Sequence, residues 1–99
     1  MSLPIIIRPD AQRDIQEAHG WYGHVQDRHG RTFVEALDDA FSRISEHPEA
    51  FQVIHRQARR YVLDRFPYLI IYVVTTTAIE VIAVAHGSRR PRIWRRRLP

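Results

Sequence analysis

The sequence contains no cysteine and no lysine, and each absence excludes a kind of chemistry. Without cysteine the chain forms no disulfide, binds no metal through thiolates and has no thiol nucleophile. All fifteen basic residues are arginine. Guanidinium keeps its proton near neutral pH and forms a planar fork suited to carboxylates and phosphates. A lysine general base is therefore excluded, whereas the net charge of +4 favours an anionic partner.

Long apolar runs are also absent from the sequence. No stretch approaches the roughly 20 apolar residues that a membrane-spanning helix needs. The N-terminal run "LPIII" is too short for a signal peptide and has no positive charge before it. We therefore expect a soluble, cytoplasmic protein. Residues 1–99 are expected to form one domain, because domains cluster near about 100–150 residues.

The N-terminal part predicts a strand followed by a helix. Residues 3–7 form a short run with three β-branched isoleucines, and the breaker pair Pro9–Asp10 follows soon after it. This pattern is typical of a strand. Asp10 is the predicted N-cap of the helix that follows. From Ala11 to Val25, apolar residues recur at spacings of three and four, which places them on one face of this helix.

A second amphipathic helix is predicted after Gly30. Its apolar stripe begins at Phe33, and acidic residues occupy the other faces. His47–Pro48 is expected to end it, because the residue before proline avoids the helical conformation. About four residues would then join the two helices, which predicts an antiparallel helical hairpin.

After residue 50 the pattern becomes that of strands. The predicted strands are 51–55, 58–66, 68–74 and 78–86. The last two are apolar on both faces apart from Glu80, which predicts that they are the central strands. The whole order predicts an α+β domain, with an N-terminal strand and a helical hairpin packed on a mostly antiparallel, three- to four-stranded C-terminal sheet.

The chain ends in a basic segment that follows directly after an apolar strand. One tryptophan, Trp94, is surrounded by Arg89, Arg90, Arg92, Arg95, Arg96 and Arg97. We expect Trp94 to fold back onto the sheet or the helical hairpin. An anchored Trp94 would hold its neighbouring arginines in fixed positions, and fixed arginines bind anions better than mobile ones.

His86 ends the last predicted strand beside this segment. Cleavage of a phosphodiester needs proton carriers and fixed positive charge for the developing phosphorane. The proton carriers available on the predicted sheet are His55, Tyr61, Asp64, Tyr68, Glu80 and His86. A strand-end histidine is more often structural than catalytic, so both roles stay open for His86. Helical metal sites pair histidines at i and i+4, whereas His19, His24 and His29 are spaced by five, so we expect no metal or cofactor.

The second half of the chain resembles the RelE/ParE superfamily of bacterial toxins from toxin–antitoxin systems, often described as plasmid stabilisation proteins. The resemblance rests on Pro48, Arg59, Arg60, Phe66, Pro67, Tyr68, Tyr72, His86, Arg89, Arg90, Trp94 and Arg97. It implies a small α+β toxin in a hetero-oligomer with a cognate antitoxin. The antitoxin's C-terminal segment would wrap the helical hairpin and the sheet and so neutralise the toxin.

The superfamily divides according to target. RelE-like members cleave messenger RNA on the ribosome, which implies that Arg60 and Arg90 stabilise the phosphate and that His86 carries the proton. ParE-like members inhibit DNA gyrase, which implies target-binding roles for Arg59, Arg60, Arg89, Arg90, Arg92 and Trp94. Within the C-terminal segment the resemblance implies that Arg89 and Arg90 are the main contacts and that the last three arginines are solvated. Because the nuclease branch carries a basic cluster with lysines and a tyrosine near the position of Trp94, gyrase inhibition is the leading hypothesis. An mRNA interferase and a basic nucleic-acid-binding module without toxicity are the alternatives.

Overall fold

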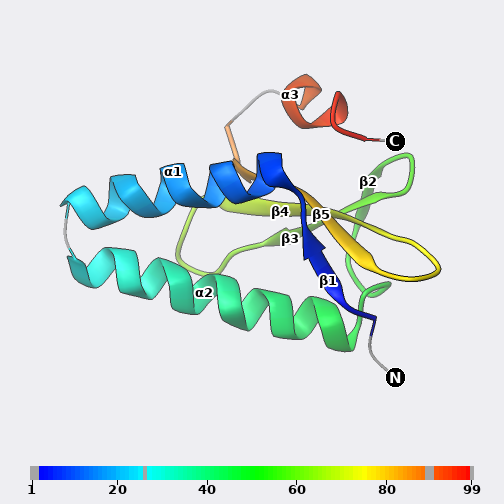
Figure 1. Ribbon diagram of the computed structural model, residues 1–99, viewed down its shortest axis with the longest axis horizontal. Coiled ribbons are helices and arrows are strands. Elements are labelled where there is room, and N and C mark those ends of the chain that lie inside the picture. Colours follow the sequence, from blue (N-terminus) through cyan, green and yellow to red (C-terminus); the bar gives the residue numbers. More distant parts are fainter. Residues whose placement is uncertain (1–2, 26, 89–90, 99) are drawn as a thin grey trace.

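The computed structural model describes residues 3–25, 27–88 and 91–98, with the side chains of residues 22–31 left out of the description. Its elements are β1 (Ile5–Ile7), α1 (Pro9–Val25), α2 (Asp27–Glu46), β2 (Val53–His55), β3 (Ala58–Val62), β4 (Tyr68–Val74), β5 (Ile79–His86) and α3 (Arg92–Arg95). Helices α1 and α2 run side by side as a hairpin, and α3 is a separate short helix (Figure 1). The predicted α+β fold is confirmed. No described helix is long and apolar enough to cross a membrane.

The five strands form one sheet in the order β1-β5-β4-β3-β2. The four C-terminal strands pair in antiparallel fashion, as predicted, and β4 and β5 are interior strands. The N-terminal strand joins the same sheet, where β1 pairs with β5 in parallel. A parallel pair needs a long crossover between its strands. The helical hairpin is part of that crossover and therefore lies against the sheet.

Helix α1 begins two residues earlier than predicted, at Pro9 and not at Ala11. The carbonyl of Arg8 accepts a hydrogen bond from the backbone N–H of Gln12 at 2.9 Å, so Arg8 is the N-cap and Pro9 is the first helical residue. The prediction of Asp10 as N-cap was wrong. Proline is well suited to the first helical position because its fixed φ is already helical and no partner is needed for an N–H there. Asp10 instead lies in the first turn, where its carboxylate pairs with Arg13.

Helix α2 begins at Asp27, so Gly30 lies inside the helix and does not precede it. Only residue 26 separates the two helices, and the prediction of a four-residue connection was wrong. A helical glycine costs about 1 kcal/mol relative to alanine. The long apolar stripe of α2 offsets that cost by packing on the sheet. The predicted end before Pro48 is confirmed, since α2 ends at Glu46.

Apolar residues are buried on both faces of the sheet. On one face, which we call the helical face, residues of α1 and α2 such as Phe33 and Ile44 pack against Ile70, Tyr72 and Val81. The opposite face, which we call the tail face, is covered by the C-terminal end of the chain. Its buried residues are Ala58, Ile71, Val73, Ile82, Ala83, Ala85 and Trp94.

Tyr72 connects the helical face to the end of α2. Its side chain is fully buried, and its hydroxyl donates a hydrogen bond to the carbonyl of Pro48 at 2.7 Å. Burial raises the pKa of Tyr72 to about 12, although the nearby cation of Arg59 acts in the opposite direction. In the unfolded chain a tyrosine loses its proton near pH 10. Unfolding therefore releases a proton between about pH 10 and 12, and stability falls as pH rises through that range.

A Tyr72→Phe variant is expected to lose this part of the alkaline destabilisation. Two pKa units correspond to about 2.7 kcal/mol. Urea titrations near pH 9 and near pH 12 should show the wild-type free energy of unfolding falling by about 2 kcal/mol more than that of the variant. At pH 9 the variant should be about 1 kcal/mol less stable, because it lacks the hydrogen bond to Pro48. Parallel declines in the two proteins would contradict the assignment to Tyr72.

Candidate target-binding surface

Trp94 anchors the C-terminal segment, which we define as residues 91–98. The segment begins at Pro91, whose carbonyl accepts hydrogen bonds from the backbone N–H groups of Trp94 and Arg95 at 3.2 and 3.0 Å. The resulting helix α3 directs Trp94 onto the tail face, where the side chain is 5% exposed and packs in the same cluster as Ala83 and Ala85. The predicted folding back of Trp94 is confirmed.

Arg97 holds the same segment from the other end. Its Nη1 donates to Oδ2 of Asp14 at 2.6 Å, and its Nη2 donates to Oδ1 of Asp14 at 3.3 Å. The Arg97 side chain is only 18% exposed. The expectation that the last three arginines are solvated was therefore wrong for Arg97. The hydrogen bond to Asp14 raises the pKa of Arg97, so the guanidinium keeps its proton and its positive charge.

The Asp14–Arg97 pair completes the outer edge of β5. Strand β1 ends at Ile7, and the last backbone hydrogen bond along this edge is from Arg8 to Val81 at 3.1 Å. Beyond it, the N–H of Val84 donates to Asp14 Oδ2 at 3.0 Å, and Arg97 Nη1 donates to the carbonyl of Ile82 at 3.3 Å. These side chains satisfy backbone groups that a neighbouring strand would otherwise pair.

A second arginine secures the end of the segment to the sheet. Arg8 donates from Nε and Nη2 to Glu80 Oε1 at 3.0 and 2.8 Å. Its Nη1 also lies 3.5 Å from the carbonyl of Arg97, within hydrogen-bonding reach. The C-terminal segment is thus attached through an aromatic anchor, a partly buried ion pair and a backbone contact. It forms an ordered layer on the sheet.

Three arginines of this layer project into solvent. Arg92, Arg95 and Arg96 are exposed, and none of them forms an ion pair with a carboxylate of the described residues. We call these three residues the tail arginines. The guanidinium of Arg95 lies over the Trp94 ring, 5.6 Å from its centroid, and is held in place by this cation–π contact. An exposed cation that is held in place, and that no described carboxylate neutralises, is suited to binding an anionic surface.

The neighbouring arginines Arg59 and Arg60 point to opposite faces of the sheet. Arg60 pairs with Ile71, which packs with Trp94, so Arg60 belongs to the tail face. Arg59 pairs with Tyr72 on the helical face, and its Nη1 donates to the carbonyls of Glu49 and Phe51 at 2.9 and 2.7 Å. Arg59 therefore stabilises the turn after α2 through these hydrogen bonds, and it lies on the face of the sheet opposite Trp94. Arg89 and Arg90 lie outside the described residues.

His86 is also on the helical face and so is separated from Arg60. It pairs with Tyr68, and the two rings meet edge to face with centroids 5.4 Å apart. The backbone N–H of Ser88 donates to His86 Nδ1 at 3.1 Å, which leaves the proton of the neutral ring on Nε2. The two described members of the hypothetical nuclease site, His86 and Arg60, are not brought together on one face.

Two functional features were missed by the sequence analysis. Asp14 lies three residues after Ala11 and four before Ala18, and both alanines are buried. A carboxylate on this apolar stripe is therefore expected to be buried as well, and a buried carboxylate needs a cationic or hydrogen-bonding partner. Arg56 occupies the tight turn between β2 and β3 with a positive φ of 52°, where glycine is the usual residue. The sequence "HRQA" offered no glycine to mark that turn.

Comparisons with known proteins give one consistent result. The family model described as the ParE toxin of type II toxin–antitoxin systems, parDE, matches residues 5–91. Toxin ParE2 from two Mycobacterium tuberculosis strains, CDC 1551 / Oshkosh and H37Rv, is 28% identical over 92 residues, which cover 92% of this chain and 88% of the relative. A solved structure described as the chromosomal ParDE TA system from P. aeruginosa has a TM-score of 0.64 at 12% identity, covering 86% of this chain and 96% of that one. The last likeness concerns the fold alone.

Proposed function

Since the chain belongs to the family of ParE toxins from type II toxin–antitoxin systems, we propose that it inhibits DNA gyrase and that a cognate antitoxin neutralises it. The observation that supports this proposal is the C-terminal segment anchored by the buried Trp94, which carries the three exposed tail arginines and holds Arg95 through a cation–π contact. Such a surface binds an anionic partner without first having to order a flexible tail. Gyrase with its bound DNA presents anionic surfaces to such cations.

The proposed target-binding residues share the tail face or the segment that covers it. They are Arg60, Arg92, Trp94, Arg95 and Arg96. Arg89 and Arg90 immediately precede this segment in the sequence, and we retain them as proposed contacts. Arg59 is left out because it is on the opposite face and is engaged with backbone carbonyls.

Binding is better supported than RNA cleavage by the arrangement of the described residues. A phosphodiester-cleaving site needs the proton carrier and the stabilising cation around the same phosphate. His86 and Arg60 point to opposite faces of the sheet, so they cannot surround one phosphate. Trp94 cannot act as a general acid or base. Its indole N–H can donate a hydrogen bond, but it does not transfer its proton near neutral pH and has no lone pair to accept one.

Two assays run in parallel test the proposal against the nuclease alternative. The purified protein is added to gyrase with supercoiled and relaxed plasmid, and separately to a translating extract whose messages are mapped by primer extension. We expect loss of supercoiling, or accumulation of gyrase-linked DNA breaks, together with intact messages. Codon-positioned cuts in the messages with unaffected gyrase would overturn the proposal in favour of a ribosome-dependent nuclease.

Removing the three tail arginines should weaken gyrase inhibition and leave the fold intact. An Arg92→Ala/Arg95→Ala/Arg96→Ala variant is expected to need at least about tenfold more protein for half-inhibition, a loss of about 1.4 kcal/mol or more in binding. Its free energy of unfolding should change little, because each exposed surface substitution contributes within about 0.5 kcal/mol. Both quantities are measured on the same preparation, by a supercoiling titration and a urea titration.

The matched control is an Arg13→Ala/Arg43→Ala/Arg65→Ala variant. It has the same change in net charge, and all three side chains are exposed on α1, α2 and the β3–β4 connection. It should inhibit gyrase like the wild type. Equal losses of inhibition in the two triple variants would show that net charge, and not the C-terminal segment, determines binding.

A further inference from the structure

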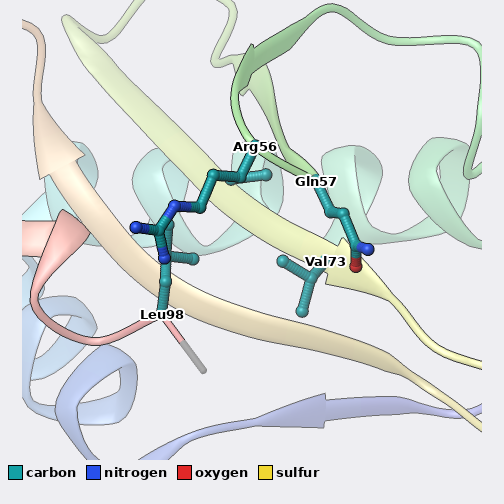
Figure 2. Close-up of a pocket in the computed structure, with 5 residues that line it drawn as sticks. Arg56, Gln57, Val73 and Leu98 are labelled. Atoms are coloured by element: carbon teal, nitrogen blue, oxygen red, sulfur yellow. The ribbon is translucent and has the colours of Figure 1, made fainter.

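A pocket of about 290 Å³ lies between the β2–β3 turn and the end of the C-terminal segment. It is lined by Arg56, Gln57, Ala58, Val73 and Leu98, and we call it the Arg56 pocket. Figure 2 shows Arg56 and Gln57 entering from the turn, with Arg56 reaching towards Leu98 and Gln57 lying beside Val73. Ala58 and Val73 are buried members of the tail-face cluster, and Leu98 packs against it. The pocket thus has an apolar floor and a rim with one cation and one amide.

The backbone at Arg56 has an unusual conformation for an arginine. His55 pairs with Ala58, so Arg56 and Gln57 alone form the turn between β2 and β3. The φ of Arg56 is 52°, in the left-handed region, where a residue with a side chain costs about 1–2 kcal/mol more than glycine. The turn requires a residue that tolerates positive φ, and nothing in its geometry requires a guanidinium.

The guanidinium of Arg56 also has no carboxylate to neutralise it among the described residues. The neighbouring residue His55 is under the influence of this charge and of that of Arg95. Partial burial, followed by the charges of Arg95 and Arg56, lowers the pKa of His55, which lies between the turn and Trp94. The pocket therefore carries one guanidinium, that of Arg56, which pairs with no carboxylate in the described ranges of the chain.

We propose that the Arg56 pocket binds an acidic residue flanked by an apolar residue in a peptide segment of the antitoxin, an inference that rests on the proposed function. The carboxylate would accept two hydrogen bonds from the planar fork of Arg56. The apolar neighbour would pack on Ala58, Val73 and Leu98. The side-chain amide of Gln57 can both donate to and accept from the peptide backbone.

The position of the pocket favours the antitoxin over the target as occupant. Leu98 belongs to the C-terminal segment, and Arg95 is one of the tail arginines. A peptide held in the pocket would lie beside the proposed target-binding surface and cover part of it, as neutralisation requires. An apolar floor also suits a peptide with apolar side chains better than a nucleic-acid backbone, which is charged at every phosphate.

An Arg56→Gly substitution tests this inference without destabilising the protein. Glycine adopts positive φ without steric cost, so the variant should unfold at a temperature equal to or above that of the wild type. Loss of a bidentate charged contact should raise the Kd for the purified cognate antitoxin at least about tenfold. Arg56→Lys keeps the charge but not the fork, and its Kd should lie between those of the wild type and Arg56→Gly.

The matched control is Arg65→Gly. Arg65 also has a positive φ, 71°, is also exposed, and lies in the β3–β4 connection next to α2, so charge and backbone change in the same way at a distant site. Its Kd for the antitoxin should equal that of the wild type. If both glycine variants bound equally well, the pocket inference would be overturned while the proposed function stood.

Two other outcomes would also overturn the inference. If the wild-type protein did not bind the antitoxin, both the pocket inference and the neutralisation part of the proposed function would fail. If Arg56→Gly weakened gyrase inhibition at least tenfold but left the antitoxin Kd unchanged, the pocket would be a target contact, and the antitoxin would not be its occupant. Isothermal titration calorimetry with the antitoxin and a supercoiling titration on the same preparations distinguish these outcomes.

Discussion

Arg97→Ala is expected to lower the free energy of unfolding by about 3–5 kcal/mol, because it leaves the buried carboxylate of Asp14 without its cation. Asp14 is 7% exposed and would retain only the hydrogen bond from Val84. The substitution also removes the donor to the carbonyl of Ile82 at the edge of β5. A urea titration measures the loss directly.

The adjacent Arg96→Ala variant provides the control for this prediction. Arg96 is exposed and forms no ion pair with the described residues, so its loss should change stability by less than about 0.5 kcal/mol. A double-mutant cycle with Asp14→Ala should give a coupling energy of about 1–3 kcal/mol, as expected for a directly bonded pair. Equal stabilities of Arg97→Ala and Arg96→Ala would contradict the role assigned to the Asp14–Arg97 pair.

Trp94→Ala is expected to have an effect of similar size, about 3–5 kcal/mol, because a large buried aromatic side chain leaves a cavity when truncated. The substitution also detaches α3 from the tail face, so the tail arginines lose their fixed positions. Gyrase inhibition should therefore fall at least about tenfold, even at temperatures where the variant is fully folded. Thermal unfolding by circular dichroism and a supercoiling titration measure the two effects.

Trp21→Ala is the matched control, since Trp21 lies on α1 and is 62% exposed. Its effect on stability should be well below that of Trp94→Ala. Trp94→Phe retains an aromatic anchor and should keep most of the stability and inhibition. If Trp94→Ala were folded and still inhibited gyrase like the wild type, the ordered C-terminal segment would not be the binding surface.

The elements of the fold could be predicted because each one depends on local signals. Apolar periodicity located both long helices and all five strands, and His47–Pro48 located the end of α2. The start of α2 could not be predicted in this way, because the packing of a long amphipathic helix outweighed the glycine at position 30. Trp94 was placed correctly for a simple reason, which is that a large aromatic beside a buried strand gains most by covering it.

The composition of each sheet face could not be predicted, because it depends on one irregularity in the pairing. A bulge shifts the register between Ile71 and Tyr72, opposite the β5 residues 81–83. Val81 faces the helices, so strict alternation along β5 would place His86 on the tail face with Trp94. Because of the bulge, Val84 and His86 lie on the helical face, and Ala83 and Ala85 lie on the tail face. A bulge has no reliable signal in one sequence, so the separation of His86 from Arg60 became visible only in three dimensions.

The arginines of the C-terminal segment likewise look alike in sequence and differ in the structure. Arg97 is partly buried against Asp14 because β1 is too short to cover the edge of β5. Strand length relative to a neighbour is a tertiary property. Arg92, Arg95 and Arg96 are exposed and form no ion pair with any carboxylate in the part of the chain that the structure describes. The division between one arginine engaged in an ion pair and three exposed arginines therefore follows from the sheet edge, not from the basic composition.

The most direct test of the central claim is a titration of gyrase inhibition with antitoxin. Gyrase is first inhibited with the wild-type protein, and the purified cognate antitoxin is added in increasing amounts while supercoiling is followed. We expect supercoiling activity to recover fully once the molar concentration of toxin-binding sites on the antitoxin equals that of the toxin. An unrelated acidic protein at the same concentration should give no recovery. Supercoiling that is unaffected by the protein from the start, or that stays inhibited in excess antitoxin, would contradict the account.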